Sequence, residues 1–310
     1  MGTSRRHFLV HSSLALAAAS CKAPSFLSST QRRVERTLHG IPTTDGDGVR
    51  INRVIGQPLL RNLDPFLLLD RFHSDDPDAY IRGFPDHPHR GFETVTVMLE
   101  GRMRHRDSRG NHGLIAGGGA QWMTAGRGII HSEMPEQEEG LMSGFQLWVN
   151  LPAAEKLCPQ FYQDLGPAQL GQGTLTSAGS RISVIAGEVQ GLVGPVRERP
   201  TEPILLSSVL EDDRPFEMDT PETHTAFVFV GSGEVAIGPD ETLVREGAIA
   251  LLGPGERLRL RAPTQRTELL IAAGRPLHEP IVQRGPFVMN TEAEIRQAFA
   301  DYRAGVLDRS

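Results

Sequence analysis

The sequence predicts an all-β protein made of two antiparallel β-barrels in tandem, followed by a short C-terminal helix. Its 310 residues suit one large or two ordinary domains of roughly 100–200 residues each. The 33 glycines and 22 prolines divide the chain into short elements, which disfavours a bundle of long helices. Short apolar stretches recur between these residues, as strands do. Their layout also occurs twice along the chain, which indicates two duplicated units.

The first unit is expected at residues 41–167. Within it, residues 94–99 alternate threonine with apolar side chains and predict a strand. Glu100-Gly101 then predicts a turn, and residues 103–106 run back from it. We therefore expect a hairpin at this point.

The second unit is expected at residues 182–289, after a connection at residues 168–181 that is rich in glycine, serine and threonine. Strands are predicted at residues 225–230 and 234–237, with a glycine-containing turn between them, and again at residues 244–252. This order of strand, turn and strand repeats that of the first unit, so the two barrels are expected to share a topology.

A C-terminal helix is predicted at residues 290–305. Thr291 and Glu294 have the spacing of a capping box, in which two side chains satisfy backbone groups at a helix start. Four apolar side chains then follow at helical spacing. They are Ile295, Ala298, Phe299 and Tyr302.

The first twenty residues have the pattern of a secretory signal peptide: a charged start, a short apolar run and then small residues. The pair Arg5-Arg6, followed by Phe8 and Leu9, resembles the twin-arginine export signal. Residues 1–20 are therefore expected to direct export to the periplasm, and residues 21–40 to form a polar tether.

Cys21 follows two alanines and a serine, as in a weak lipobox. Lipidation of Cys21 and ordinary cleavage near Ala19 both remain open. The other cysteine is Cys158, so an intramolecular disulfide is not expected. No stretch beyond residue 30 approaches the ~18 apolar residues of a membrane span.

Two short pieces of the first unit carry candidate metal ligands. His87 and His89 lie two positions apart, and so do His131 and Glu133. Residues at i and i+2 of an extended chain face the same side. If the two pieces meet inside one barrel, three imidazoles and one carboxylate converge. The sequence therefore predicts a metal site there.

The ligand types indicate which metal is expected. Imidazole suits Fe, Zn, Cu and Ni, and adding a carboxylate with open positions favours Fe(II), with Mn, Ni or Cu as substitutes. Glu93 competes with Glu133 for the carboxylate position, because Glu93 would share the face of His89 on a regular strand. His105 and His112 are expected at the surface or behind the ligands.

The second unit has fewer candidates. His224 and His278 have no partner ligands nearby in the sequence, so the second barrel is expected to lack a metal site.

Several segments resemble the pirin family of the cupin superfamily. The most specific are HPHRGFETVT at residues 87–96 and WMTAGRGIIHSEMP at residues 122–135. Residues 64–72, 274–280 and 285–291 fit the same family. The resemblance covers about residues 40–305. It implies two cupin-type, jelly-roll-like barrels, the first of which carries one metal ion, usually iron.

In the pattern of this family the metal ligands fall on His87, His89, His131 and Glu133, while Glu93 is not a ligand. Some pirins cleave the flavonol quercetin with dioxygen. The resemblance thus implies a metal-dependent dioxygenase, with Fe(II) expected and Mn, Ni, Cu, Co or Zn as alternatives. Glu133 could accept the proton of a substrate hydroxyl, as ligand or after detaching.

A non-enzymatic protein that senses redox state or metal is the competing hypothesis. The expected partners are a small aromatic substrate and O2. Nucleic acid is not an expected partner, because acidic residues (38) outnumber basic ones (32). The oligomeric state remains open, with a monomer as the default expectation.

Overall fold

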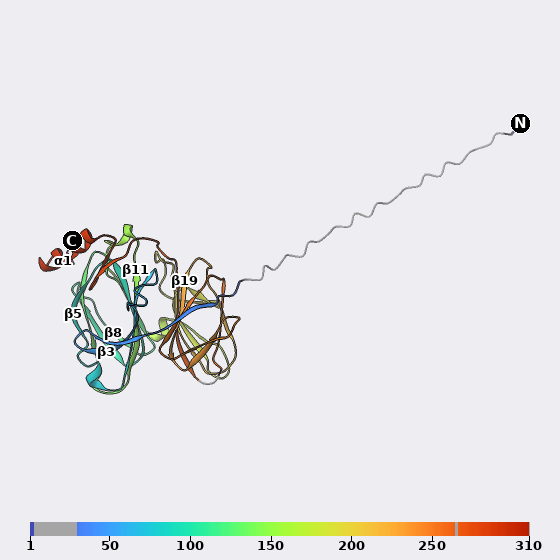
Figure 1. The fold of residues 1–310 in the computed structure, drawn as a ribbon, viewed down its shortest axis with the longest axis horizontal. Helices are drawn as coiled ribbons and strands as arrows, with labels where there is room; N and C mark the ends of the chain where they lie inside the picture. The colour runs from blue at the N-terminus through green and yellow to red at the C-terminus, as the bar shows by residue number, and fades with distance from the viewer. Residues whose placement is uncertain (3–29, 264–265, 310) are drawn as a thin grey trace.

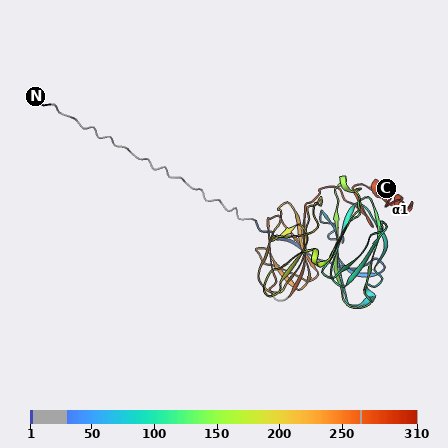
Figure 2. The ribbon, with the colours of Figure 1, turned by 180° about the vertical axis from the view of Figure 1, so that it is seen from behind.

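The computed structural model describes residues 1–2, 30–263 and 266–309, and in them two β-barrels stand side by side (Figure 1, Figure 2). One short α-helix follows the second barrel in the chain. The predicted fold class is therefore confirmed. Residues 3–20 of the expected signal peptide and Cys21 lie outside the described residues. In the described part of the chain, no helix has the length and apolar character needed to cross a membrane.

The first barrel consists of one seven-stranded and one four-stranded antiparallel sheet among the described residues. The large sheet has the order β12-β9-β6-β11-β4-β3-β2, with bounds β2 (Ile41–Asp45), β3 (Val49–Ile55), β4 (Phe66–Ser74), β6 (Phe92–Glu100), β9 (Ala120–Thr124), β11 (Met142–Asn150) and β12 (Phe161–Leu165). The small sheet has the order β5-β10-β7-β8, with bounds β5 (Phe84–His89), β7 (Arg102–Asp107), β8 (His112–Ala116) and β10 (Ile129–Pro135).

The second barrel repeats this arrangement within the described ranges. Its large sheet has the order β1-β22-β19-β24-β17-β14-β13, with bounds β1 (Val34–His39), β13 (Gly171–Thr174), β14 (Arg181–Ala186), β17 (Ile204–Leu210), β19 (Thr225–Ser232), β22 (Ala248–Leu252) and β24 (Thr267–Gly274). Its small sheet has the order β18-β23-β20-β21, with bounds β18 (Phe216–Asp219), β20 (Glu234–Ile237), β21 (Thr242–Arg245) and β23 (Arg257–Arg261).

Short elements complete the fold. They are the two-stranded pair β15 (Glu188–Val189) and β16 (Leu192–Val193), the pair β25 (Val282–Arg284) and β26 (Phe287–Met289), the 3-10 turns η1 (Pro77–Ala79), η2 (Ala153–Glu155) and η3 (Pro167–Gln169), and the helix α1 (Glu292–Arg303).

The two large sheets pack face to face and bury one apolar core between the barrels. Phe66 meets Phe227 with ring centroids 5.1 Å apart, and Phe145 meets Phe229 at 5.7 Å. Side chains alternate along each strand, so one face of β6 enters this interface while the other face lines its own barrel. Because one face of β6 is buried against the second barrel, only the residues on its other face are available to form a site in the first barrel.

Each end of the described range 30–309 packs on the barrel farther away in the sequence. Strand β1 pairs with β22, although the sequence predicted a tether for this segment. At the other end, Phe287 is fully buried in a cluster that includes Ile130 of the first barrel. Arg90 of that barrel forms an ion pair with Asp301 at 2.6 Å. Residues 282–307, which we call the C-terminal arm, therefore cover the first barrel rather than the second.

The predicted connection at residues 168–181 also contains a strand, because β13 pairs with β14.

The predicted hairpin is wrong, although both of its strands exist. Strand β6 pairs with β9 and β11, whereas β7 pairs with β8 and β10. The turn at Glu100-Gly101 therefore carries the chain from the large sheet to the small one. The same change of sheet occurs between β19 and β20 in the second barrel. A turn sequence predicts that the chain changes direction, but whether the two flanking strands pair depends on tertiary packing.

The capping box of α1 is confirmed and supports a first prediction. The Thr291 side chain accepts a hydrogen bond from the Glu294 backbone, and the Glu294 side chain accepts one from the Thr291 backbone. We expect Thr291→Ala to lower the free energy of unfolding by about 1 kcal/mol, because the helix start loses an acceptor. Urea denaturation measures this change. Thr291→Ser, which keeps the acceptor, should retain most of the stability.

Candidate metal centre

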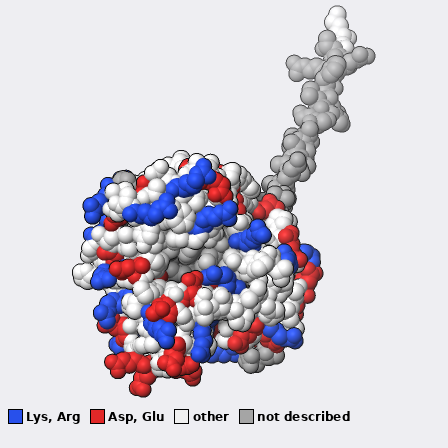
Figure 3. All heavy atoms as spheres, turned by 60° about the vertical axis from the view of Figure 1, so that its left-hand side comes forward, with Lys and Arg blue, Asp and Glu red and all other residues white. Residues whose placement is uncertain are grey.

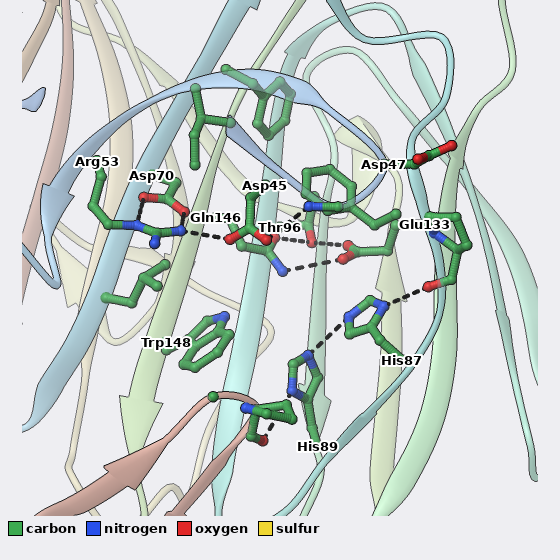
Figure 4. Close-up of a pocket in the computed structure, with 18 of the residues that line it drawn as sticks. Asp45, Asp47, Arg53, Asp70, His87, His89, Thr96, Glu133, Gln146 and Trp148 are labelled. Carbon is green, nitrogen blue, oxygen red and sulfur yellow. Dashed lines mark hydrogen bonds and ion pairs between the residues drawn. The ribbon is translucent and has the colours of Figure 1, made fainter. Parts of the chain in front are cut away.

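Pairing of β5 with β10 brings the three predicted histidines together. His87 lies directly opposite His131 in the register of these strands, and His89 is two positions from His87 on the same face. One nitrogen from each of the three rings lies within 4.8 Å of the others, so the group can hold a metal ion. Figure 4 shows His87 and His89 at one end of a pocket.

The hydrogen bonds of the histidines leave lone pairs facing one another. The Nδ1 atom of His87 lies 2.8 Å from the carbonyl oxygen of Pro85, and Nδ1 of His89 lies 3.3 Å from that of Pro286. A carbonyl oxygen only accepts, so both Nδ1 atoms carry the hydrogen. The two Nε2 atoms, 3.1 Å apart, then have only lone pairs to share when the rings are neutral. A cation between them would remove this repulsion.

Burial favours the neutral form of two of the imidazoles, those of His89 and His131. His89 and His131 are 3% and 1% exposed. Burial lowers the pKa of His89 well below its ordinary value, and the neighbouring His87 lowers it further. Burial likewise lowers the pKa of His131, with His87, His89 and His105 contributing. Neither ring nitrogen of His131 has a hydrogen-bond partner among the described residues. Neutral, buried and unpartnered nitrogens are what a divalent ion requires.

Glu133 lies in the same pocket but outside the group of three histidines. Its Oε1 lies 2.7 Å from the Thr96 hydroxyl, and its Oε2 accepts a hydrogen bond from the Gln146 amide at 3.3 Å. The Thr96 hydroxyl also lies 2.6 Å from Gln146 Oε1. The carboxylate is thus held beside the histidines by two side chains of the large sheet.

Glu93, the competing carboxylate, faces the other way. The chain turns at Gly91, where φ is +89°, so β5 and β6 do not form the regular strand on which the shared face depended. Glu93 is fully buried, accepts a hydrogen bond from Thr124 at 2.6 Å and lies 3.3 Å from the Arg199 guanidinium. Burial raises the pKa of Glu93, with Thr124 and Arg199 among the groups that oppose the rise. Glu93 therefore joins the two halves of the chain.

His105 is not at the surface. It is fully buried on β7, and its position in the register is opposite Glu133 on β10. Its ring centroid lies 5.2 Å from that of His131, and its Nε2 lies 3.9 Å from Asp107. The structure therefore places His105 behind the cluster, which was one of the two expectations. His112 is exposed on β8.

A cavity of about 740 Å³ opens beside the histidines. The sequence offers four apolar side chains near the histidines as candidate lining residues: Phe84, Phe92, Trp122 and Met123. Phe84 lines the cavity, whereas the other three lie in buried core clusters. Trp148, which lies against His89 with ring centroids 5.1 Å apart, was not identified from the sequence. The alternation of side chains along β11 was the sequence pattern that could have indicated that Trp148 faces the inside of the barrel. The apolar lining residues are Ile51, Leu68, Phe72, Phe84, Met103 and Trp148.

A charged cluster forms the end of the cavity away from the histidines (Figure 4). Arg53 donates from Nε to Asp70 Oδ1 at 3.0 Å and from Nη2 to Asp70 Oδ2 at 2.7 Å. The same Nη2 also donates to Asp45 at 2.6 Å. Asp70 is 5% exposed. Burial raises the pKa of Asp70 to about 6, against the opposing effect of Arg53.

This shift predicts how Asp70 affects stability with pH. The folded pKa is about 6 and the ordinary value is 3.8, so the folded protein binds this proton more tightly. The contribution of Asp70 is therefore present below pH 4 and is lost as the pH rises through 6. Relative to Asp70→Asn, wild-type stability should fall by on the order of 3 kcal/mol between pH 4 and pH 7. Denaturation series at both pH values test this. A stability difference that is independent of pH would contradict it.

The chain matches the model of the Pirin family over residues 48–149 and that of the Pirin C-terminal cupin domain over residues 205–308. A Pseudomonas aeruginosa protein named "Putative quercetin 2,3-dioxygenase" is 48% identical over 284 residues, which cover 90% of this chain and 99% of that protein. Pirin of Homo sapiens is 43% identical, covering 88% of this chain and 93% of its own.

Solved structures agree with the described fold. The crystal structure of a quercetin 2,3-dioxygenase from Acinetobacter baumannii superimposes with a TM-score of 0.83 at 34% sequence identity. The match covers 89% of this chain and 98% of that one. The likeness therefore extends over both barrels.

Proposed function

This chain belongs to the pirin family, and from that premise we propose that it is a metal-dependent dioxygenase that cleaves flavonols or related enolisable aromatics with O2. The observation that carries the proposal is the group of three imidazoles, two of which, His87 and His89, line a cavity with apolar sides. The names of the Pseudomonas and Acinetobacter relatives support the choice of substrate.

His87, His89 and His131 would hold the ion, and Glu133 would join them as a fourth ligand when its side chain turns toward them. The donor set favours Fe(II), and Mn, Ni, Cu, Co or Zn are alternatives. A bound ion of this kind supplies Lewis acidity that lowers the pKa of a substrate hydroxyl, and a redox-active ion also exchanges electrons with O2.

The carboxyl group of Glu133 is arranged to receive a proton. Thr96 Oγ1 lies within hydrogen-bond distance of Glu133 Oε1 and of Gln146 Oε1, yet its hydroxyl has one hydrogen to donate. When Glu133 Oε1 carries a proton, it donates to Thr96, Thr96 donates to Gln146, and Gln146 donates to Glu133 Oε2. Each contact then has one hydrogen. The hydrogen bonds of Thr96 and Gln146 therefore remain complete when Glu133 accepts a proton.

The cavity walls orient an aromatic substrate and exclude water. Trp148 packs on Phe92 with ring centroids 4.3 Å apart, which fixes the indole beside the histidines. Phe72 and Phe84 line the same cavity. A flat aromatic substrate packed among these rings would displace water from the reacting atoms.

Quercetin turnover by purified, metal-loaded protein tests the proposal. We expect loss of the quercetin absorption band with consumption of one O2 per molecule cleaved. Glu133→Gln should slow turnover by at least about 100-fold, because the acceptor of the proton is lost. Glu136→Gln is the control, because Glu136 directly follows β10 and lies outside the cavity lining. If the protein loaded with Fe, Mn, Ni, Co or Cu in turn does not turn over quercetin, the flavonol reaction is contradicted. A non-enzymatic protein that senses redox state or metal is then the remaining hypothesis.

We further propose export to the periplasm by the twin-arginine route, which rests on the sequence of residues 1–20. Replacing Arg5 and Arg6 by lysine keeps the charge and should retain the protein in the cytoplasm. Cell fractionation measures this, and mass spectrometry of the periplasmic protein identifies its first residue and any lipid on Cys21. Equal periplasmic amounts of variant and wild type would contradict the proposal.

A further inference from the structure

The cavity has two chemically different ends. The histidines and Glu133 occupy one end, and Arg53, Asp70 and Asp45 occupy the other, with Trp148 between them (Figure 4). The mechanism above uses only the first end. The second consists of ionic groups that come from three different strands and are held in fixed positions by their hydrogen bonds.

The distal cluster retains unused hydrogen-bonding capacity. The Nε and Nη2 atoms of Arg53 are engaged by the two aspartates, whereas no hydrogen bond of Nη1 occurs among the described residues. The Arg53 side chain is 24% exposed where it lines the cavity. Nη1 can therefore donate to an oxygen of a ligand, and the carboxylate oxygens of Asp45 and Asp70 retain lone pairs that can accept from a hydroxyl.

The lining of the cavity has an excess of negatively charged side chains. It contains five carboxylates and one guanidinium: Asp45, Asp47, Asp70, Asp86, Glu133 and Arg53. On the face turned forward in Figure 3, acidic and basic side chains both reach the surface, so this excess belongs to the cavity rather than to the whole face. A cavity whose lining has an excess of negative charge repels an anionic ligand.

Resting on the function proposed above, we propose that this distal cluster is a subsite for the hydroxyl groups of an uncharged aromatic ring, and that the cavity rejects anionic ligands. The substrate class is therefore an uncharged polyhydroxylated aromatic, whose hydroxylated ring lies against Arg53, Asp70 and Asp45 while its reacting ring faces the histidines. Carboxylated or sulfonated analogues of the same shape are excluded.

Binding to the metal-free protein tests this without turnover. Three flavones serve as probes: luteolin, with two adjacent hydroxyls on its pendant ring; chrysin, with none; and luteolin sulfonated on that ring. All three lack the 3-hydroxyl of a flavonol. Titration calorimetry gives each affinity, and fluorescence adds a local signal because Trp148 lines the cavity while Trp122 is fully buried in the interface. We expect wild type to prefer luteolin to chrysin, and to bind sulfonated luteolin at least about tenfold more weakly than luteolin.

Two variants separate the hydrogen-bonding and charge effects. Arg53→Gln should weaken luteolin about tenfold and chrysin less than about twofold, because only luteolin has a partner for Nη1. Arg53→Gln/Asp70→Asn, which leaves no unpaired buried charge, serves if the single variant unfolds. Asp47→Asn should raise the affinity for sulfonated luteolin several-fold and leave luteolin unchanged. Asp76→Asn is the matched control, because Asp76 pairs with Arg50 outside the cavity lining.

Equal weakening of luteolin and chrysin by Arg53→Gln would overturn the hydroxyl subsite. Equal affinity of wild type for luteolin and its sulfonate would overturn the exclusion of anions, and absence of luteolin binding would overturn both. Quercetin turnover is measured separately on the metal-loaded protein. Selective luteolin binding without quercetin turnover would thus contradict the proposed reaction and leave the subsite standing.

Discussion

Replacing His131 by alanine is expected to abolish stoichiometric metal binding. His131 lies opposite His87 across the β5–β10 pair, and both of its nitrogens lack partners among the described residues. Removing one of three imidazoles should weaken metal affinity by more than about 100-fold, which exceeds the effect of altering an outer hydrogen bond. Elemental analysis of purified protein should fall from about one metal per chain to near zero.

Thermal or urea unfolding gives an independent measurement. A metal ion at one hundred times its dissociation constant should stabilise wild type by about 2.7 kcal/mol and leave His131→Ala unchanged. His112→Ala is the matched control, because His112 is exposed and lies outside the group of three. Metal binding by His131→Ala that equals that of His112→Ala would rule out the proposed centre.

Gly91→Ala is expected to detach the C-terminal arm from the first barrel. Gly91 has φ of +89°, and a Cβ atom there would lie 2.0 Å from the carbonyl oxygen of Val288. The oxygen belongs to the backbone and the position of a Cβ is fixed by the backbone, so no side-chain rotation can relieve the overlap. Lys156 also joins these residues, since its Nζ donates to the Gly91 oxygen at 2.8 Å and to the Val288 oxygen at 3.0 Å. We expect a loss of at least about 3 kcal/mol of stability.

Gly110 provides the matched control for this substitution. It has φ of +90°, but a Cβ there would meet no atom within 4 Å. Gly110→Ala should therefore show only the cost of the left-handed backbone, about 1–2 kcal/mol. The difference between the two variants in urea denaturation measures the contact with the arm, and hydrogen exchange in residues 282–307 should rise only in Gly91→Ala. Equal losses in both would mean that the arm is not held at Gly91.

The strand content and the candidate ligand histidines could be predicted because both depend on local patterns. Two-residue spacing puts His87 and His89 on one face of any extended segment, and Thr291 with Glu294 caps a helix wherever one begins there. Pairing of β5 with β10 was required for the group of three and was not itself readable from spacing. Likewise, the predicted hairpin at Glu100-Gly101 had the correct strands but the wrong pairing.

The carboxylates show most clearly where local reasoning stops. Glu93 and Glu133 were equivalent by spacing, yet a positive φ at Gly91 and the partner barrel direct Glu93 toward Arg199. Trp148 and the distal cluster of Arg53, Asp70 and Asp45 could not be recognised as cavity lining, because these residues come from four strands of the large sheet. Their common location depends on how that sheet curves.

By itself, the amino-acid sequence determined that the chain forms two β-barrels and that three histidines of the first unit are available for a metal. The family resemblance favoured Glu133 over Glu93, but spacing did not separate them, and the tertiary structure shows which one lies beside the histidines. Only the tertiary structure decided that the C-terminal arm meets His89 and that a charged cluster forms the far end of the cavity. The physical reason is the distance along the sequence over which each interaction acts. The alternation of side chains is set by neighbouring residues. Strand register, sheet packing and the burial of a carboxylate are set by segments that can lie about 200 residues apart or more, as the contact between His89 and Pro286, 197 positions on, illustrates.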